Sequence, residues 1–207
     1  GQLDPAARRV IRAASIYGSV FKRDGVRALL QTEKSTNDLR QGLRQLLDAE
    51  LLSSRSADPG SDDDEYVFRN ALIRDAAYGL LTDEDRHIGH RRAAEYLEQS
   101  DEQDPLAIAE HLVKGEQFSH AATYFLRAGL RSFECNDLEE ALRRAKRGLE
   151  YAEPGQTQGE LRTLLTMAFC WRSELSAAYE QSILAWPLLE PGSRWESARW
   201  PGAGRWR

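Results

Sequence analysis

The chain has 207 residues, and its 33 acidic side chains outnumber 28 basic ones, which gives a net charge of −5 at pH 7. This length suits one large or two small domains, each with a hydrophobic core. The acidic balance disfavours a dedicated nucleic-acid-binding protein, which usually carries a basic excess. No apolar run approaches the roughly 20 residues that cross a bilayer. The two distant cysteines, Cys135 and Cys170, indicate neither a disulfide framework nor a metal site, and we expect a cytoplasmic protein.

The first eighty residues predict a small domain in which helices alternate with short strands. Asp4 and Pro5 form a helix start, and apolar residues then recur at helical spacing. In chain order we expect a helix over residues 4–18, a strand at 20–21, helices at 26–30 and 37–50, strands at 51–52 and 66–68, and a helix at 69–81. Three helices and two strands joined by a polar loop are typical of a winged helix.

From residue 82 onward the pattern is helical with short breaks. Thr82 and Asp85 match a capping box, and the breaks that follow are periodic. Glu153-Pro154-Gly155 recurs as Glu190-Pro191-Gly192, which is 37 residues later. A repeat of this length predicts stacked helical hairpins, because one helix pair alone cannot bury its apolar face.

Small residues indicate where two helices of the best repeat make contact. Gly129 and Ala141 are 12 residues apart, and the pattern resembles that of tetratricopeptide repeats. We therefore predict a mainly α fold, with a winged-helix domain over residues 1–81, a short α-α solenoid of tetratricopeptide-like hairpins over 82–192, and an irregular tail over 193–207 that we interpret as a truncation. The predicted structural contacts of the repeat are Phe125, Ala128, Gly129, Ala141, Ala145 and Pro154.

Two segments of the chain resemble a known family. The stretch from Phe68 to Tyr78, FRNALIRDAAY, and the stretch from Ala13 to Phe21, AASIYGSVF, are similar to signatures of bacterial STAND-type signalling ATPases. The likeness extends from about Leu3 to Gly192. It is greatest to the region behind the kinase and ATPase domains of large bacterial serine/threonine kinases.

The resemblance implies a regulatory role in a longer protein. In the family a phosphate-loop ATPase precedes a winged helix and tetratricopeptide-like repeats, so the chain would couple partner binding on the repeats to an upstream domain. The resemblance also singles out Asn70, because the family commonly has His there, and in related ATPases that His contacts the nucleotide phosphate. The departure argues against a cofactor-binding role for Asn70.

No motif in the chain predicts catalysis. The sequence has no G-x-x-x-x-G-K-[ST] phosphate loop and no kinase catalytic loop, so we predict no catalytic residue and no cofactor. His87 and His90 are three residues apart, near Asp83 and Asp85, but further metal ligands do not follow at a recognisable spacing. We interpret these residues as capping and surface groups and predict no metal site.

Two kinds of partner remain open. A basic run with Arg143, Arg144 and Arg147 predicts a contact for a protein partner, although such runs are more often a solvated helix face. The alternative function is that of a DNA-binding transcriptional regulator, with Arg40 and Arg44 on the third helix and the repeats as sensor. The acidic loop between the two later strands would repel phosphates, which disfavours nucleic acid.

Overall fold

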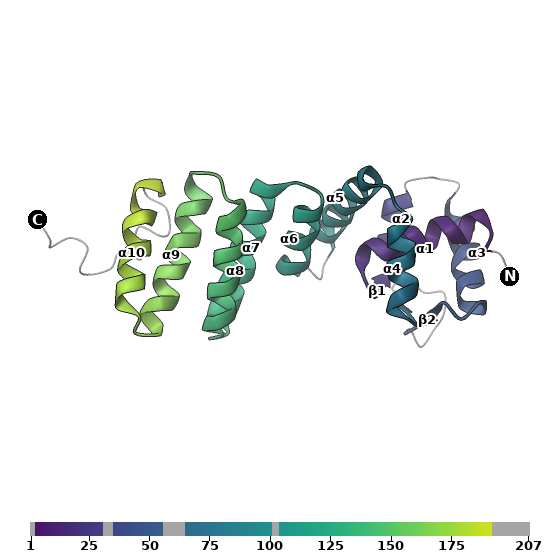
Figure 1. Ribbon diagram of the computed structural model, residues 1–207, viewed down its shortest axis with the longest axis horizontal. Helices are drawn as coiled ribbons and strands as arrows, with labels where there is room; N and C mark the ends of the chain where they lie inside the picture. The colour runs from purple at the N-terminus through teal and green to yellow at the C-terminus, as the bar shows by residue number, and fades with distance from the viewer. Residues whose placement is uncertain (1–2, 31–34, 56–64, 101–103, 192–207) are drawn as a thin grey trace, which may run out of the picture. The chain divides into compact units, whose positions relative to one another are not determined.

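The computed structural model describes residues 3–30, 35–55, 65–100 and 104–191. Within these ranges the chain forms ten α-helices, one short 3-10 helix and one three-stranded sheet, so the predicted mainly α class is confirmed (Figure 1). The chain divides into two compact units, Gly1–Gln103 with Lys114–Glu116, and Asp104–Val113 with Gln117–Arg207. The predicted tail at 193–207 and most of the acidic loop before residue 65 lie outside the described residues.

The first unit follows the predicted order of helices and strands. Asp4 accepts a hydrogen bond from the backbone N–H of Ala7 at 2.7 Å, with Pro5 at the first helical position. Thr82 accepts one from the N–H of Asp85 at 3.1 Å, which confirms the predicted cap. The elements are α1 (Pro5–Tyr17), β1 (Val20–Lys22), α2 (Arg23–Leu30), α3 (Ser35–Asp48), β2 (Leu52–Ser54), β3 (Glu65–Phe68), α4 (Ala71–Gly79) and α5 (Asp83–Gln99).

The sheet is antiparallel, with β3 between β1 and β2. Val67 pairs with both Val20 of β1 and Ser53 of β2. The ring of Phe21 lies 5.7 Å from the rings of both Tyr66 and Phe68, measured between centroids. These aromatic side chains belong to the same buried core as apolar residues of α1 and α3, so one face of the sheet packs against these helices.

Helix α5 belongs to the first unit, because it packs against α1 and α2. Ala93 is fully buried with Ile16 and Leu29, and the side chain of Arg92 donates to the Leu29 carbonyl oxygen at 3.2 Å. The first compact unit thus includes α5 and extends to Gln103, whereas the sequence pattern divides the chain after residue 81. A capping box marks the start of a helix, and it carries no information about which core the helix joins.

The second unit consists of helices in sequence. Figure 1 shows α7 to α10 side by side, and each packs against the next. The elements are α6 (Pro105–Lys114), α7 (Phe118–Glu134), α8 (Leu138–Tyr151), α9 (Gln156–Trp171), α10 (Leu175–Ala185) and the 3-10 helix η1 (Trp186–Leu188).

The turns after α7 and α9 repeat one backbone geometry. Asn136 and Ser173, which are 37 residues apart, have positive φ angles of 60° and 62°. At each turn the next backbone N–H donates to the carbonyl oxygen of Ser132 or Phe169, both at 2.9 Å. A left-handed residue with this long hydrogen bond is the Schellman helix ending. The 37-residue period of the sequence is therefore also present in the backbone.

Glycines allow the helices of the second unit to approach closely. A Cβ atom at Gly129 would lie 2.8 Å from Cδ2 of Leu164, and one at Gly148 would lie 2.8 Å from Cδ2 of Leu161 and 3.0 Å from Cβ of Phe125. Leu161 and Leu164 are fully buried. Side chains of α9 thus fill the space that the glycines leave on α7 and α8.

Candidate functional site

The residues predicted as repeat contacts lie where α7 meets α8, apart from Pro154. A Cβ atom at Gly129 would lie 3.5 Å from the backbone oxygen of Ala141 and 3.7 Å from the nitrogen of Ala145. Pro154 is exposed in the turn before α9. The buried members of the set are Phe125, Ala128, Gly129, Ala141 and Ala145.

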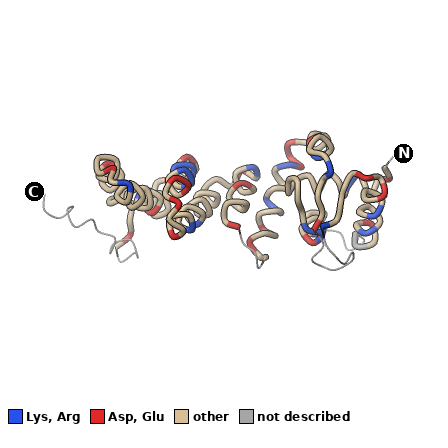
Figure 2. The backbone as a smooth tube through the Cα atoms, turned by 90° about the horizontal axis from the view of Figure 1, so that it is seen from below, with Lys and Arg blue, Asp and Glu red and all other residues tan. Residues whose placement is uncertain are grey.

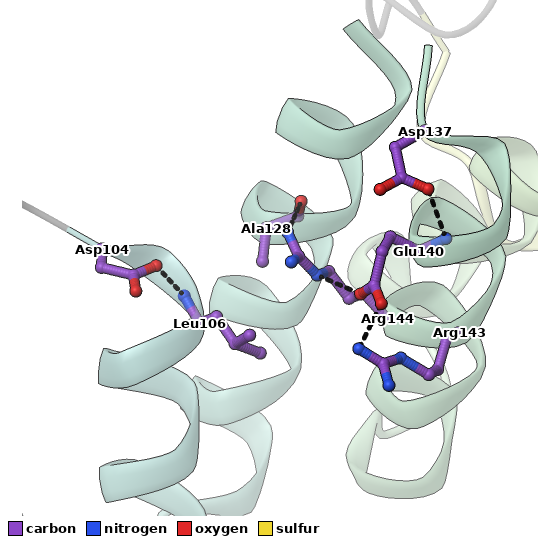
Figure 3. A network of polar contacts seen from close by, with 7 residues as sticks. All are labelled: Asp104, Leu106, Ala128, Asp137, Glu140, Arg143 and Arg144. Carbon is purple, nitrogen blue, oxygen red and sulfur yellow. Dashed lines mark hydrogen bonds and ion pairs between the residues drawn. The ribbon is translucent and has the colours of Figure 1, made fainter. Parts of the chain in front are cut away.

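The three arginines predicted as a partner contact lie in different surroundings, and Arg144 is the least exposed of them. Its side chain donates to the Glu140 carboxylate at 3.1 Å and to the carbonyl oxygen of Ala128 at 3.1 Å (Figure 3). Arg143 pairs with the other oxygen of the Glu140 carboxylate and is largely exposed. Arg144 therefore ties α8 to α7, and its charge already has a partner within the chain.

Arg147 lies against an aromatic cluster. Its guanidinium carbon is 5.7 Å from the ring centroid of Phe125 and 6.0 Å from that of Tyr151. Tyr151 in turn stacks on Phe118, with 5.6 Å between centroids. Arg147 also forms an ion pair with Glu110 of α6 at 3.5 Å. Like Arg144, it has an acidic neighbour within the unit.

Helix α7 carries a basic face that the sequence analysis did not single out. Arg127 and Arg131 are exposed, and neither forms an ion pair with a described residue. The guanidinium of Arg127 lies 4.7 Å from the ring centroid of Tyr124, and the ring of His120 packs edge-on at 5.3 Å. We call His120, Tyr124, Arg127 and Arg131 the α7 face. Their spacing of four, three and four residues is the helical signal that could have found it.

Charge on the rest of the described surface is mixed. Figure 2 shows Lys and Arg interleaved with Asp and Glu along the chain. Many of these side chains pair locally, as Arg86 does with Asp83 at 3.0 Å. Exposed pairs of this kind contribute about 0–1 kcal/mol each. Arg127 and Arg131 of α7 differ from these side chains because neither has an ion-pair partner among the described residues. They are therefore the candidates for binding an external anion.

Asn70 caps α4. Its backbone is extended, and its Oδ1 accepts a hydrogen bond from the N–H of Leu72 at 2.9 Å. Asn is among the residues preferred at this position, since its side-chain oxygen satisfies a helix N–H that has no partner inside the helix. Helix capping therefore explains why Asn stands at position 70, and a contact with a bound nucleotide is not needed to explain it.

His87 and His90 have unrelated surroundings, although they are three residues apart on α5. His87 Nδ1 lies 3.5 Å from a carboxylate oxygen of Glu116. His90 is buried, and its Nε2 shares a hydrogen bond with the hydroxyl of Tyr78 at 3.0 Å. Burial also raises the pKa of Tyr78. Over the part of the chain that the structure describes, no three His, Cys, Asp or Glu residues are grouped so that they could hold a metal ion.

Comparison with known proteins adds no assignment. Protein-family descriptions, curated proteins and solved structures were compared with this chain, and none matches it. None of the described helices has both the length and the apolar character needed to cross a membrane. The functional argument therefore depends on the chain's own residues and geometry.

Proposed function

We propose that this chain is a non-catalytic regulatory and protein-interaction module of a bacterial STAND-type signalling ATPase or serine/threonine kinase. Support comes from the first unit, where the element order and the β1-β3-β2 sheet agree with what we expect of a winged helix. It also comes from the second unit, where the helical pairs and their turns repeat after 37 residues, as in a tetratricopeptide-like solenoid. Partner binding on the repeats would be transmitted to a neighbouring domain that holds the catalytic groups.

The α7 face is the observation that carries this proposal. Two exposed arginines, Arg127 and Arg131, have no ion-pair partner among the described residues, and the guanidinium of Arg127 lies over the ring of Tyr124. Arg binds carboxylates through paired N–H donors and is enriched at protein interfaces. The partner is therefore an acidic protein segment. Arg131 also lies in the last turn of α7, where a positive charge favours the helix dipole, but that effect does not account for Arg127.

Helix α4 supplies the second contact that the proposal needs. It is formed by the stretch that resembles the STAND signature, yet one large apolar side chain of the helix and another directly after it are on the surface. Leu72 is 73% exposed, and Leu80, directly after the helix, is 65% exposed. Exposed apolar side chains at both ends of this short helix are compatible with a contact to a neighbouring domain. We assign this face to the contact with the upstream domain of the parent protein.

A charge-reversal experiment tests the partner-binding part. The probe is a fluorescein-labelled peptide of alternating Glu and Leu, and the neutral control replaces Glu by Gln. The chain should bind the acidic peptide at low salt, and Arg127→Glu with Arg131→Glu should weaken binding about tenfold or more, which is roughly 1.4 kcal/mol. Arg40→Glu with Arg44→Glu is the matched control. Equal losses in the two double variants would contradict a specific α7 face.

DNA binding is the second candidate, and one observation favours it. Asn37, Arg40, Gln41 and Arg44 are exposed along α3, and neither arginine forms an ion pair with a described residue. These residue types read bases and contact phosphates in many DNA-binding helices. Duplex DNA titrated at low and moderate salt tests this function with the same two double variants. Salt-sensitive binding lost only in the Arg40→Glu, Arg44→Glu variant would favour a DNA regulator.

A further inference from the structure

The α7 face has a third arginine beside it, which comes from the next helix. Arg144 of α8 donates to the carbonyl oxygen of Ala128 at 3.1 Å, and Ala128 directly follows Arg127 (Figure 3). A helix carbonyl oxygen points toward the N–H four residues later, so the Arg144 guanidinium lies beside the turn of α7 that carries Arg131. Three guanidinium groups are thus carried by this part of α7 or placed against it.

The carboxylate that serves this group of arginines is already occupied. The two oxygens of Glu140 pair with Arg143 and Arg144 (Figure 3). Glu134 is exposed three residues after Arg131, but the two side chains do not form an ion pair. Arg127 and Arg131 therefore keep two positive charges that no carboxylate among the described residues neutralises.

We propose that the α7 face binds a phosphorylated serine or threonine of the partner segment, an inference that rests on the protein-binding function proposed above. Arg127 and Arg131 are four residues apart, so their side chains are neighbours on the helix surface. A phosphate group carries a charge of about −1.5 to −2 at pH 7 and three acceptor oxygens, so one phosphate can neutralise both arginines. A carboxylate has one charge and two oxygens, which a single guanidinium satisfies by itself.

The surroundings of Arg127 favour an ordered contact with an anion. Its guanidinium lies 4.7 Å from the ring centroid of Tyr124, which is itself buried, and His120 packs edge-on against that ring at 5.3 Å. A guanidinium held over an aromatic ring has less freedom to lose when a ligand binds.

The helix end opposes this contact in part. Arg131 lies in the last turn of α7, where the carbonyl end of the helix repels an anion. Arg131 alone would thus be a poor anion site, and the proposal requires both arginines.

Three fluorescein-labelled peptides that differ at one residue test the proposal. Each is a short peptide of Gly, Ala and Leu with phosphoserine, glutamate or serine at its centre, and binding is followed by fluorescence anisotropy at low salt. The phosphoserine peptide should bind at least about tenfold more tightly than the glutamate peptide, and the serine peptide should bind most weakly. Arg127→Glu with Arg131→Glu should remove this preference, with helical circular dichroism unchanged because both side chains are exposed.

Arg40→Glu with Arg44→Glu is the matched control. These residues of α3 are also exposed and four residues apart, so the control should keep the preference for phosphoserine. Equal affinities for the phosphoserine and glutamate peptides would overturn the phosphate assignment, and the proposed function would stand if the peptide of alternating Glu and Leu still bound the α7 face. Failure of all these peptides to bind would contradict both.

Duplex DNA is the competitor that distinguishes a nucleic acid from a phosphorylated protein. Each phosphodiester of DNA carries a single charge, so DNA should displace the phosphoserine peptide poorly at equal phosphate concentration. Displacement by DNA as effective as that by unlabelled phosphoserine peptide would overturn the proposal.

Discussion

Replacing Gly148 by Ala should destabilise the second unit, although the same change favours an isolated helix. A Cβ atom at this position would lie 2.8 Å from Cδ2 of Leu161 and 3.0 Å from Cβ of Phe125. Leu161 is fully buried, and the Cβ atom of Phe125 is bonded directly to the backbone, so neither can easily move aside. Ala in place of a helical Gly gains up to about 1 kcal/mol, whereas overpacking costs about 1–3 kcal/mol. We therefore expect a net loss of up to about 2 kcal/mol.

Two other helical glycines provide the controls. A Cβ atom at Gly79 would have no neighbour within 4 Å, so Gly79→Ala should stabilise the chain slightly. At Gly129 the close contact is with Cδ2 of Leu164 alone, and no atom bonded to the backbone lies as near as Cβ of Phe125 does at Gly148, so the loss there should be smaller than at Gly148. Urea denaturation followed by helical circular dichroism gives the midpoints. If Gly148→Ala raises its midpoint as Gly79→Ala does, the packing of α9 on α8 is not as described.

Other substitutions test the hairpin contact, the turns and a buried hydroxyl. Ala141→Leu should cost about 1–3 kcal/mol because Ala141 is fully buried, whereas Glu139→Leu on the exposed side should cost little; equal urea midpoints would mean that the wrong face has been assigned. Ser173→Gly should gain up to about 1 kcal/mol, measured by thermal melting, because Ser173 has a φ of 62°; a lower midpoint would contradict the assigned turn. Burial, reinforced by the nearby hydroxyl of Tyr96, raises the pKa of Tyr17, whose hydroxyl donates to the Gly25 carbonyl oxygen at 2.9 Å. The fold then favours the protonated phenol, so its stabilisation is complete below the unfolded pKa of about 10 and declines above it; stability should fall more steeply there than in Tyr17→Phe, and parallel pH curves would refute this.

The sequence by itself determined where the helices and strands lie. Asp4 and Thr82 cap helices at the predicted residues, because a cap depends on a side chain and a backbone N–H only three residues apart. The 37-residue period found in the sequence also separates the turns at Asn136 and Ser173, since a helix ending is a local structure. Gly129 could be placed at a helix contact because close approach requires a small residue.

Only the tertiary structure decided which charges pair with each other within the described residues and which core each helix joins. Arg144 and Arg147 form part of one basic run, yet the carbonyl oxygen of Ala128 and the carboxylate of Glu110 engage them, while Arg127 has no ion-pair partner among the described residues. Helix α5 joined the first unit for a similar reason, because the core that buries Ala93 comes from α1 and α2. The spacing of residues along a helix specifies which face of the helix each side chain is on. The side chains or backbone atoms that pack against that face are distant in the sequence. They are fixed only when the helices pack.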